Sequence, residues 1–218
     1  ETKTLLELGY TKLVCCKKDN LVFINPKRNK EYLIKNSMNS KFNLNKYNEL
    51  FKVQKKSYLK ELEYIQRQVN KGNALDVGCG NGNFLRVAKE KGWNTYGLDP
   101  NIHNIKKSME YANVKLGTLE YGQYEENFFD IITCHSTFYY FTNPLNFLLK
   151  ARKIMKPNGI IYISQIPNID SFYAKFNIYN YLSSYPPGQV SYYFSKKTLE
   201  NIVAKAGLKI LDYRTKGI

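Results

Sequence analysis

Between residues 73 and 166, short apolar runs alternate with segments in which apolar residues recur every three or four positions. The runs predict buried strands, and the longer period predicts amphipathic helices. Strands that alternate with helices in this way form a parallel sheet covered on both faces. Strands are expected at 74–77, 95–98, 114–117, 128–134 and 160–166, and helices at 83–91, 101–111 and 144–155.

The pattern differs on either side of this region. Two β-prone runs, Tyr10–Cys16 and Leu21–Ile24, flank a Lys-Lys-Asp-Asn turn and predict a hairpin. Apolar residues at helical spacing then predict a helix over residues 45–70. Near the other end of the sequence, a helix is expected at 195–206 and a strand at 208–213.

These patterns divide the chain into an N-terminal hairpin and helix extension, residues 1–72, and a doubly wound α/β domain, residues 73–218. Residues 168–195 interrupt the alternation, and nine aromatic residues lie between positions 172 and 194. The insertion follows the fifth expected strand, at the sheet edge where α/β proteins bind ligands. Two interpretations stay open: a lid whose tyrosines stack on a polar acceptor, or a small helical cap that packs on itself.

A glycine-rich segment joins the first strand of this domain to its first helix. Gly78, Gly80 and Gly82 allow a ligand to lie against the backbone, and the start of the helix offers free N–H groups. The spacing is G-x-G-x-G, which is neither the dinucleotide fingerprint G-x-G-x-x-G nor a P-loop. The second strand ends at Asp99, where a carboxylate can accept hydrogen bonds from a ribose diol.

These segments, in this order, resemble the motifs of class I S-adenosylmethionine-dependent methyltransferases. The similarity extends over roughly residues 73–215, and further matching stretches are Val114–Glu120, Phe129–Cys134, Lys156–Gly159 and Tyr193–Ser195. Residues Cys15–Pro26 resemble the front of small methyltransferases that act on sugars and other small metabolites. The resemblance implies a Rossmann-like fold, S-adenosyl-L-methionine as the cofactor, and methyl transfer as the activity.

The resemblance also implies where the cofactor binds. The cofactor-binding residues it indicates are Asp76, Gly78, Cys79, Gly80, Gly82, Asp99, Pro100, Thr118, Leu119 and Cys134. The three glycines would underlie the methionine part, and Asp76 would support that loop or the amino group. Asp99 would take the ribose hydroxyls, and Pro100 and Leu119 would flank the adenine.

Transfer to an oxygen atom benefits from a general base. Many relatives carry a Glu-His pair after the fourth strand, but this chain has Tyr139-Tyr140 there. His135 is the best substitute, because a histidine at a strand end that opens into a crevice titrates near neutrality. A hydrogen-bonded structural histidine is the alternative. The candidate catalytic residues are therefore His135, Tyr139 and Tyr140.

The net charge of +15 raises the question of nucleic-acid binding. Only 5 of the 33 basic residues are Arg, the residue best suited to planar readout of phosphates and bases. No Asn-Pro-Pro-Tyr follows the fourth strand, and Cys134 is not part of a Pro-Cys pair. These features argue against a nucleic-acid partner. An RNA methyltransferase stays open as a less favoured alternative.

The preferred acceptor is a small polar metabolite, namely the hydroxyl of a free, nucleotide-linked or phosphorylated sugar in capsule or other surface-glycan biosynthesis. The alternatives are another oxygen or nitrogen of a small molecule, such as a phosphorylated headgroup, or a cofactor-binding protein without catalysis. The sequence leaves a homodimer open.

The four cysteines form neither a disulfide framework nor a complete zinc set. We therefore expect no metal site and a cytoplasmic location. No apolar run approaches the roughly 20 residues that a spanning helix needs, so no membrane partner is expected.

Overall fold

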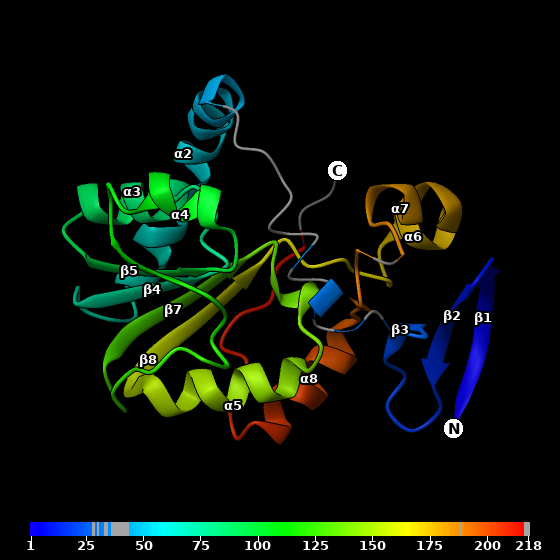
Figure 1. Cartoon of the computed structure of the whole chain (residues 1–218). Helices are drawn as coiled ribbons and strands as arrows, with labels where there is room; N and C mark the ends of the chain where they lie inside the picture. The colour runs from blue at the N-terminus through cyan, green and yellow to red at the C-terminus, as the bar shows by residue number, and fades with distance from the viewer. Residues whose placement is uncertain (28, 30, 33–34, 36–43, 188, 216–218) are drawn as a thin grey trace. The chain divides into compact units, whose positions relative to one another are not determined.

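The computed structural model describes the chain except for residues 28, 30, 33–34, 36–43, 188 and 216–218 (Figure 1). Part of the region that follows the predicted hairpin therefore lies outside the described residues. The chain forms two compact units, which are described separately below. Unit 1 comprises Glu1–Leu33, Phe138–Leu149 and Gln165–Ile218, and unit 2 comprises Ile34–Thr137 and Lys150–Ser164.

A five-stranded sheet forms the centre of unit 2. In spatial order its strands are β6 (Asn113–Leu116), β5 (Asn94–Asp99), β4 (Asn73–Val77), β7 (Phe129–His135) and β8 (Met155–Ser164). Every pairing between these neighbours is parallel. The predicted parallel α/β architecture is thus confirmed, and the carboxyl ends of β5, β4 and β7 lie at one edge of the sheet.

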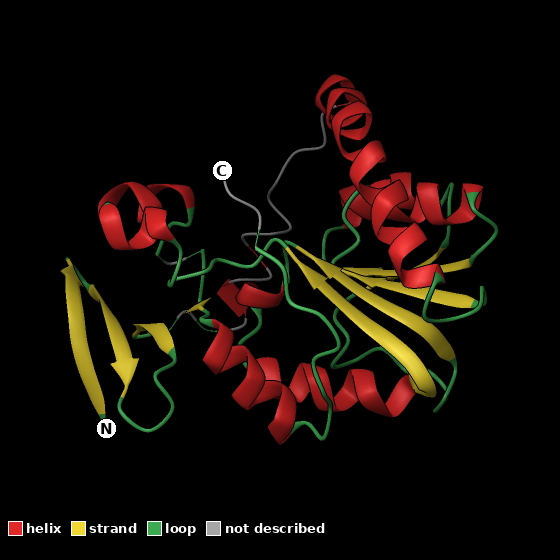
Figure 2. Cartoon of the chain, turned by 180° about the vertical axis from the view of Figure 1, so that it is seen from behind, coloured by secondary structure: helices red, strands yellow, loops and turns green. Residues whose placement is uncertain are grey.

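Helices α2 (Leu44–Gln66), α3 (Asn83–Glu90) and α4 (Ile102–Ser108) belong to the same unit. Figures 1 and 2 show α3 and α4 together on one face of the sheet. Tyr58 and Leu62 of α2 are buried in one apolar cluster with Phe84 of α3 and Ile131 of β7. This burial holds α2 beside the carboxyl edge of the sheet, although the sequence assigned that helix to a separate extension.

An ion pair ties β8 to the amino end of its neighbour β7. Lys156 Nζ lies 2.8 Å from both carboxylate oxygens of Asp130, and the amide of Asn73 donates to the same carboxylate at 2.7 Å. The Pro157-Asn158-Gly159 sequence, which is typical of a turn, lies within the bounds of β8, and this strand starts five residues before the predicted one. Met155 pairs with Phe129 and Ile160 pairs with Ile131, so residues 156–159 have no strand-pairing partner on β7 and form an irregularity within β8.

Unit 1 contains an antiparallel sheet with the order β1 (Thr2–Leu8), β2 (Thr11–Cys16), β3 (Val22–Asn25) and β9 (Tyr192–Tyr193). The predicted hairpin is confirmed as β2 and β3, and β1 is an additional strand. Because β3 pairs with β9, a segment near residue 22 and one near residue 193 share a sheet. The two compact units therefore do not follow the predicted boundary between residues 72 and 73.

The remaining elements of unit 1 lie before the expected insertion, within it, and at the expected C-terminal helix. They are η1 (Phe138–Tyr140), α6 (Phe172–Phe176), α7 (Ile178–Ser184) and α8 (Lys196–Lys205), while α5 (Pro144–Ile154) begins in unit 1 and ends in unit 2. The strand expected at 208–213 is wrong, since this stretch has no regular structure. Leu211 is exposed, and no described strand pairs with the segment. Local β-propensity alone does not form a strand where no neighbouring strand is available for pairing.

The aromatic insertion packs largely on itself within unit 1. Tyr181 and Tyr193 are buried with their rings 6.0 Å apart, and the Tyr193 hydroxyl donates to the Tyr185 carbonyl at 2.8 Å. Phe172 and Phe176 remain about four-fifths exposed and stack on each other. These contacts fit the interpretation as a self-packed cap, while closure of a lid stays a prediction.

Candidate functional site

The glycine loop between β4 and α3 has the conformation that its sequence predicts. Gly78, Gly80 and Gly82 all have positive φ, at 76°, 52° and 80°. A Cβ atom at Gly82 would lie 2.9 Å from the Ser108 Cα atom, so this glycine allows α4 to pack against the start of α3. A Cβ atom at Gly80 would meet no atom within 4 Å. Gly80 is therefore the point of the loop at which a ligand can approach the backbone.

The loop is bonded to the end of the neighbouring strand β5. The amides of Gly78 and Cys79 both donate to the Leu98 carbonyl, at 2.8 and 3.0 Å. The amide of Gly80 donates to Asp99 Oδ2 at 2.9 Å. The two strongest signals in the sequence, the glycine loop and the acidic strand end, are therefore brought together directly.

Asp99 is 5% exposed and already accepts several hydrogen bonds from the protein. Besides the Gly80 amide, the Asn101 amide donates to it at 2.9 Å and the Asn104 side chain at 3.3 Å. Burial raises the pKa of the Asp99 carboxyl, and the hydrogen bonds oppose that shift. An ionised carboxylate has about four acceptor positions, so binding both ribose hydroxyls would require the long Asn104 contact to be released.

Asp76 lies at the end of β4 and is 2% exposed. It is level with Thr133 on β7, whose hydroxyl donates to Asp76 Oδ1 at 2.8 Å. Burial raises the pKa of Asp76 to about 7, and the negative charges of Asp99 and Glu61 add to this effect. The carboxyl, two residues before the glycine loop begins, is thus partly protonated at neutral pH.

His135 ends β7 in an aromatic environment. Its Nδ1 atom lies 2.8 Å from the Ser164 hydroxyl on the paired strand β8 and 3.7 Å from Glu61 Oε2 on α2. The rings of Tyr58 and Phe84 lie 5.2 and 4.8 Å from the imidazole, and its Nε2 atom is buried without a hydrogen-bond partner.

This environment changes the expected chemistry of the histidine. Desolvation lowers the pKa of His135 to about 3, so the imidazole is neutral at physiological pH and its contact with Glu61 is not an ion pair. The expectation that His135 titrates near neutrality is wrong, because the strand end is covered by aromatic side chains instead of opening to solvent.

Glu61 is a residue of this site that the sequence reasoning missed. Its side chain is 10% exposed, and the Ser57 hydroxyl donates to its other oxygen at 3.1 Å. A signal was present, because Glu61 interrupts the apolar stripe that includes Tyr58, Leu62 and Ile65. A charged residue on the buried face of a helix indicates a polar partner or a ligand.

The other predicted cofactor residues are placed as follows. Leu119 is buried beyond β6. The hydroxyl of Thr118 beside it is buried without a hydrogen-bond partner among the described residues, which leaves a polar atom available for a ligand. The side chains of Cys79 and Cys134 are buried, and burial raises the pKa of both thiols well above the ordinary value. Pro100 follows Asp99 directly and is half-buried.

The remaining candidate catalytic residues belong to unit 1. Tyr139 is buried, Tyr140 is about one-third exposed, and their ring centroids lie 4.5 Å apart in η1. The Tyr139 carbonyl accepts a hydrogen bond from the Ser191 amide, which ties η1 to the end of the aromatic insertion. The structure therefore groups the two tyrosines with the insertion, within one unit.

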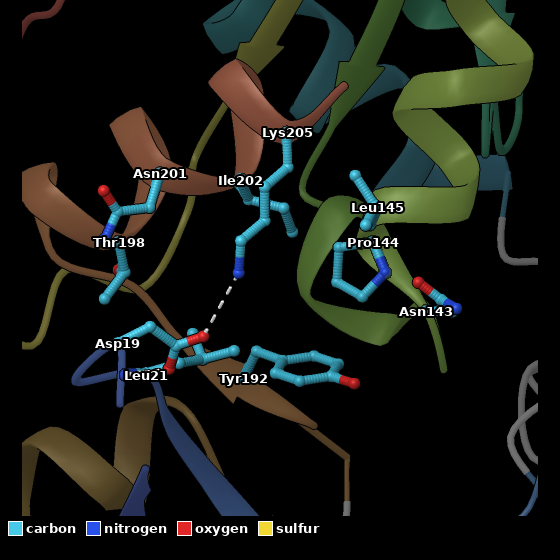
Figure 3. Close-up of a pocket in the computed structure, with 10 residues that line it drawn as sticks. All are labelled: Asp19, Leu21, Asn143, Pro144, Leu145, Tyr192, Thr198, Asn201, Ile202 and Lys205. Carbon is cyan, nitrogen blue, oxygen red and sulfur yellow. Dashed lines mark hydrogen bonds and ion pairs between the residues drawn. The ribbon is translucent and has the colours of Figure 1, made fainter. Parts of the chain in front are cut away.

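A pocket of about 170 Å³ lies within unit 1, as Figure 3 shows. Asp19 and Lys205 form an ion pair of 3.6 Å beside it, and Tyr192, Pro144 and Ile202 contribute to its wall. Tyr192 of the aromatic insertion lines this pocket, but none of the predicted cofactor-binding or catalytic residues does.

Within the described part of the chain, no group of three or more His, Cys, Asp or Glu side chains could hold a metal ion. In the same part, no helix combines the length and apolar character needed to cross a membrane.

A family model described as a methyltransferase domain matches residues 48–213. Among curated proteins, the ubiquinone biosynthesis O-methyltransferase of Histophilus somni is 29% identical over 121 residues, which are 48% of this chain and 50% of that protein. The protein of the same name from Rickettsia akari is 32% identical over 127 residues, with coverages of 52% and 51%. The chain thus spans about half the length of these curated relatives.

Solved structures show the same fold. A SAM-dependent methyltransferase from Thermotoga maritima has a TM-score of 0.59 at 24% identity, covering 75% of this chain and 77% of that one. One from Archaeoglobus fulgidus has a TM-score of 0.60 at 21% identity, with coverages of 82% and 74%. Phosphoethanolamine N-methyltransferase 2 of Haemonchus contortus, solved with S-adenosyl-L-methionine, has a TM-score of 0.56 at 18% identity, with coverages of 70% and 36%.

Proposed function

The chain belongs to the methyltransferase-domain family and has the fold of the class I enzymes that use S-adenosylmethionine, and from that premise we propose that it methylates an oxygen of a small molecule. The curated relatives are named as O-methyltransferases, which supports oxygen over nitrogen as the acceptor atom. The observation that carries the proposal is the Gly80–Asp99 hydrogen bond, because it joins the glycine loop and the acidic strand end in one ligand site.

The residues present fit S-adenosylmethionine. Gly80 leaves open space above the loop, and Asp99 retains an acceptor position for a ribose hydroxyl. The buried hydroxyl of Thr118 has no partner, although buried polar groups normally have one. When bound, the cofactor supplies an activated methyl group. The protein then has to hold the acceptor oxygen in line with that methyl group and to exclude water.

The protein groups that would contact the acceptor remain proposals. His135 is a weak base, with a pKa of about 3, and its free nitrogen is buried. Tyr139 and Tyr140 stand where many relatives carry the Glu-His pair, and we assign them to acceptor contact. The tyrosines of the insertion would add stacking area, which suits either a sugar ring or an aromatic ring.

Two acceptor classes compete within this proposal. The resemblance of residues Cys15–Pro26 to small methyltransferases that act on sugars favours a sugar hydroxyl, free, nucleotide-linked or phosphorylated, in surface-glycan biosynthesis. The name of the curated relatives favours a hydroxylated precursor of a quinone. Both are small molecules with a hydroxyl group, and they differ in the acidity of that group. A phenolic hydroxyl titrates near pH 10, as in Tyr, and therefore needs less help from a protein base than a sugar hydroxyl.

Incubation with methyl-labelled cofactor tests the proposal. The acceptors are a catechol, a set of nucleotide sugars and bulk RNA, with one of the two small-molecule classes expected to gain label. Mass spectrometry then identifies the methylated atom. Label in RNA alone, or methylation of an amine but of neither hydroxyl class, would contradict the assignment of a small-molecule oxygen.

A further inference from the structure

Glu61, Asp76 and His135 form a buried polar cluster at the carboxyl ends of β4 and β7. Glu61 Oε2 lies 3.7 Å from His135 Nδ1, and the two side chains are 10% and 7% exposed. Asp76 interacts electrostatically with Glu61. Burial raises the pKa of Tyr58, the charges of both carboxylates add to this effect, and the Tyr58 ring stacks edge-on against the imidazole. Two acidic side chains thus share one small buried region with a neutral histidine.

The charged side chains that act on Asp76 do not neutralise the negative charge of this cluster. The charged groups that act on this carboxyl are Asp99 and Glu61, which are both negative. Within the described residues, no ion pair with a lysine or arginine involves Asp76. Buried charges are normally paired, so the cluster is suited to a ligand that brings positive charge.

The histidine provides a second and independent indication of a ligand. Its Nδ1 atom is engaged by Ser164, while Nε2 is buried with no hydrogen-bond partner among the described residues. An unsatisfied buried polar atom costs about 1–3 kcal/mol. A neutral imidazole offers one donor and one acceptor nitrogen. In the tautomer whose Nδ1–H donates to the Ser164 hydroxyl, Nε2 is the acceptor, and a ligand N–H group would satisfy it.

The position of the cluster in the sheet identifies which part of the ligand it faces. In the sheet order, Asp99 ends β5 on one side of β4, and His135 ends β7 on the other. The two strands are separated by two strand spacings, or about 10 Å. A cofactor whose ribose lies at Asp99 therefore extends across the glycine loop towards Glu61 and His135 with its amino-acid end.

We propose that Glu61 and His135, together with Asp76, form the receptor for the ammonium group of the cofactor. The inference rests on the proposed function, because it assumes S-adenosylmethionine in the glycine-loop site. It adds a binding residue from α2, a helix that lies outside the resembling motifs. Glu61 supplies the counter-charge, while His135 accepts a hydrogen bond and remains neutral.

Isothermal titration calorimetry with three ligands tests the inference. S-adenosylmethionine and S-adenosylhomocysteine both carry the ammonium group, whereas 5′-methylthioadenosine lacks the amino-acid part. The test variant is Glu61→Gln, which keeps the shape and the hydrogen bond to Ser57. The matched control is Glu63→Gln, which makes the same change on an exposed position of the same helix.

Glu61→Gln is expected to weaken both amino-acid-bearing ligands about tenfold or more, because a charge-assisted hydrogen bond is lost. Its binding of 5′-methylthioadenosine and all binding by Glu63→Gln should be unchanged. Its unliganded melting temperature should be unchanged or higher, because the substitution removes a buried negative charge. Equal losses for all three ligands, with a lower melting temperature, would show a structural role and overturn the inference.

The same experiment separates the two proposals. Normal binding by the unmodified protein and by Glu61→Gln would overturn the ammonium receptor alone. If the unmodified protein bound none of the three ligands, both the receptor and the proposed function would be overturned.

Discussion

The Gly80 amide donates a hydrogen bond of 2.9 Å to the Asp99 carboxylate. This contact links the middle of the glycine loop to the last residue of β5. Asp99 consequently has two tasks, since it holds the loop in shape and presents an acceptor for a ribose hydroxyl. A change at Asp99 should therefore affect cofactor binding by both routes.

Asp99→Ala is expected to lower the affinity for S-adenosylmethionine at least about tenfold. Hydrogen bonds to a charged acceptor contribute roughly 1.5–3 kcal/mol each, and the substitution also releases the Gly80 amide. Calorimetry on the purified variant measures the effect. Asn104→Ala is the control, because it removes only the 3.3 Å contact to the carboxylate and should leave the affinity unchanged or higher. Full affinity in Asp99→Ala would refute the ribose assignment.

Gly80 and Gly82 should respond differently to alanine, although both have positive φ. Each substitution places a side chain in the left-handed region, at a cost of about 1 kcal/mol. At Gly82 the new methyl group also meets the Ser108 backbone at 2.9 Å, whereas at Gly80 it meets no protein atom.

Gly82→Ala should therefore destabilise the unliganded protein by roughly 1–3 kcal/mol more than Gly80→Ala, as overpacking does. Gly80→Ala should instead weaken cofactor binding while preserving most of the stability. Chemical denaturation and calorimetry on the two variants measure these effects. The assignment of Gly80 to the ligand face would fail if Gly80→Ala bound the cofactor normally.

Much of the fold could be predicted because the strong signals were local. The glycine loop and Asp99 are fixed by backbone conformation and by position at strand ends, and both appear in the sequence as short patterns. The pairing of β3 with β9 depends on contact between segments about 170 residues apart, as between Val22 and Tyr193. Local periodicity carries no information about such a partner.

The site was predicted less completely than the fold. The sequence placed His135 correctly at the end of a strand, but it could not show that Tyr58 and Phe84 cover the ring and lower the pKa. Glu61 was missed because its helix was assigned to an extension and not to the sheet unit. Both errors arise from the tertiary packing of α2 and α3 around the end of β7, of which the sequence carries only the position of Glu61 on an apolar stripe as a signal.

Methyl transfer should be independent of metal ions. The sequence offers no complete ligand set, and the described residues contain no cluster of metal-ligating side chains. Dialysis against a chelator should leave the rate within experimental error of the untreated enzyme, measured with the labelled cofactor. A loss of activity that a single divalent ion restores would contradict this expectation.

The last prediction concerns Asp76 and pH. Its folded-state pKa of about 7 lies above the ordinary value of 3.8, so the folded protein prefers the protonated carboxyl. The stability that this preference provides is fully present below pH 3.8, declines as the pH rises, and is lost above about pH 7. The difference across this range is at most about 4 kcal/mol for a shift of this size.

The unliganded protein should therefore melt at a lower temperature at pH 8 than at pH 5. Asp99 also has a raised pKa and contributes to the same trend, so the comparison with Asp76→Asn isolates Asp76. The variant keeps the shape of the side chain and should show a smaller decrease between the two pH values. Identical melting profiles in both proteins would show that Asp76 titrates normally.

Cofactor binding should show the opposite dependence on pH. A cationic ligand beside Asp76 favours the carboxylate and lowers its pKa, so binding below pH 7 releases a proton. The affinity for S-adenosylmethionine should then rise with pH, by up to about tenfold per unit, and level off above pH 7. Calorimetry in two buffers with different ionisation enthalpies measures the released proton directly. Its absence at pH 6, or its persistence in Asp76→Asn, would exclude Asp76 as the group that titrates with binding.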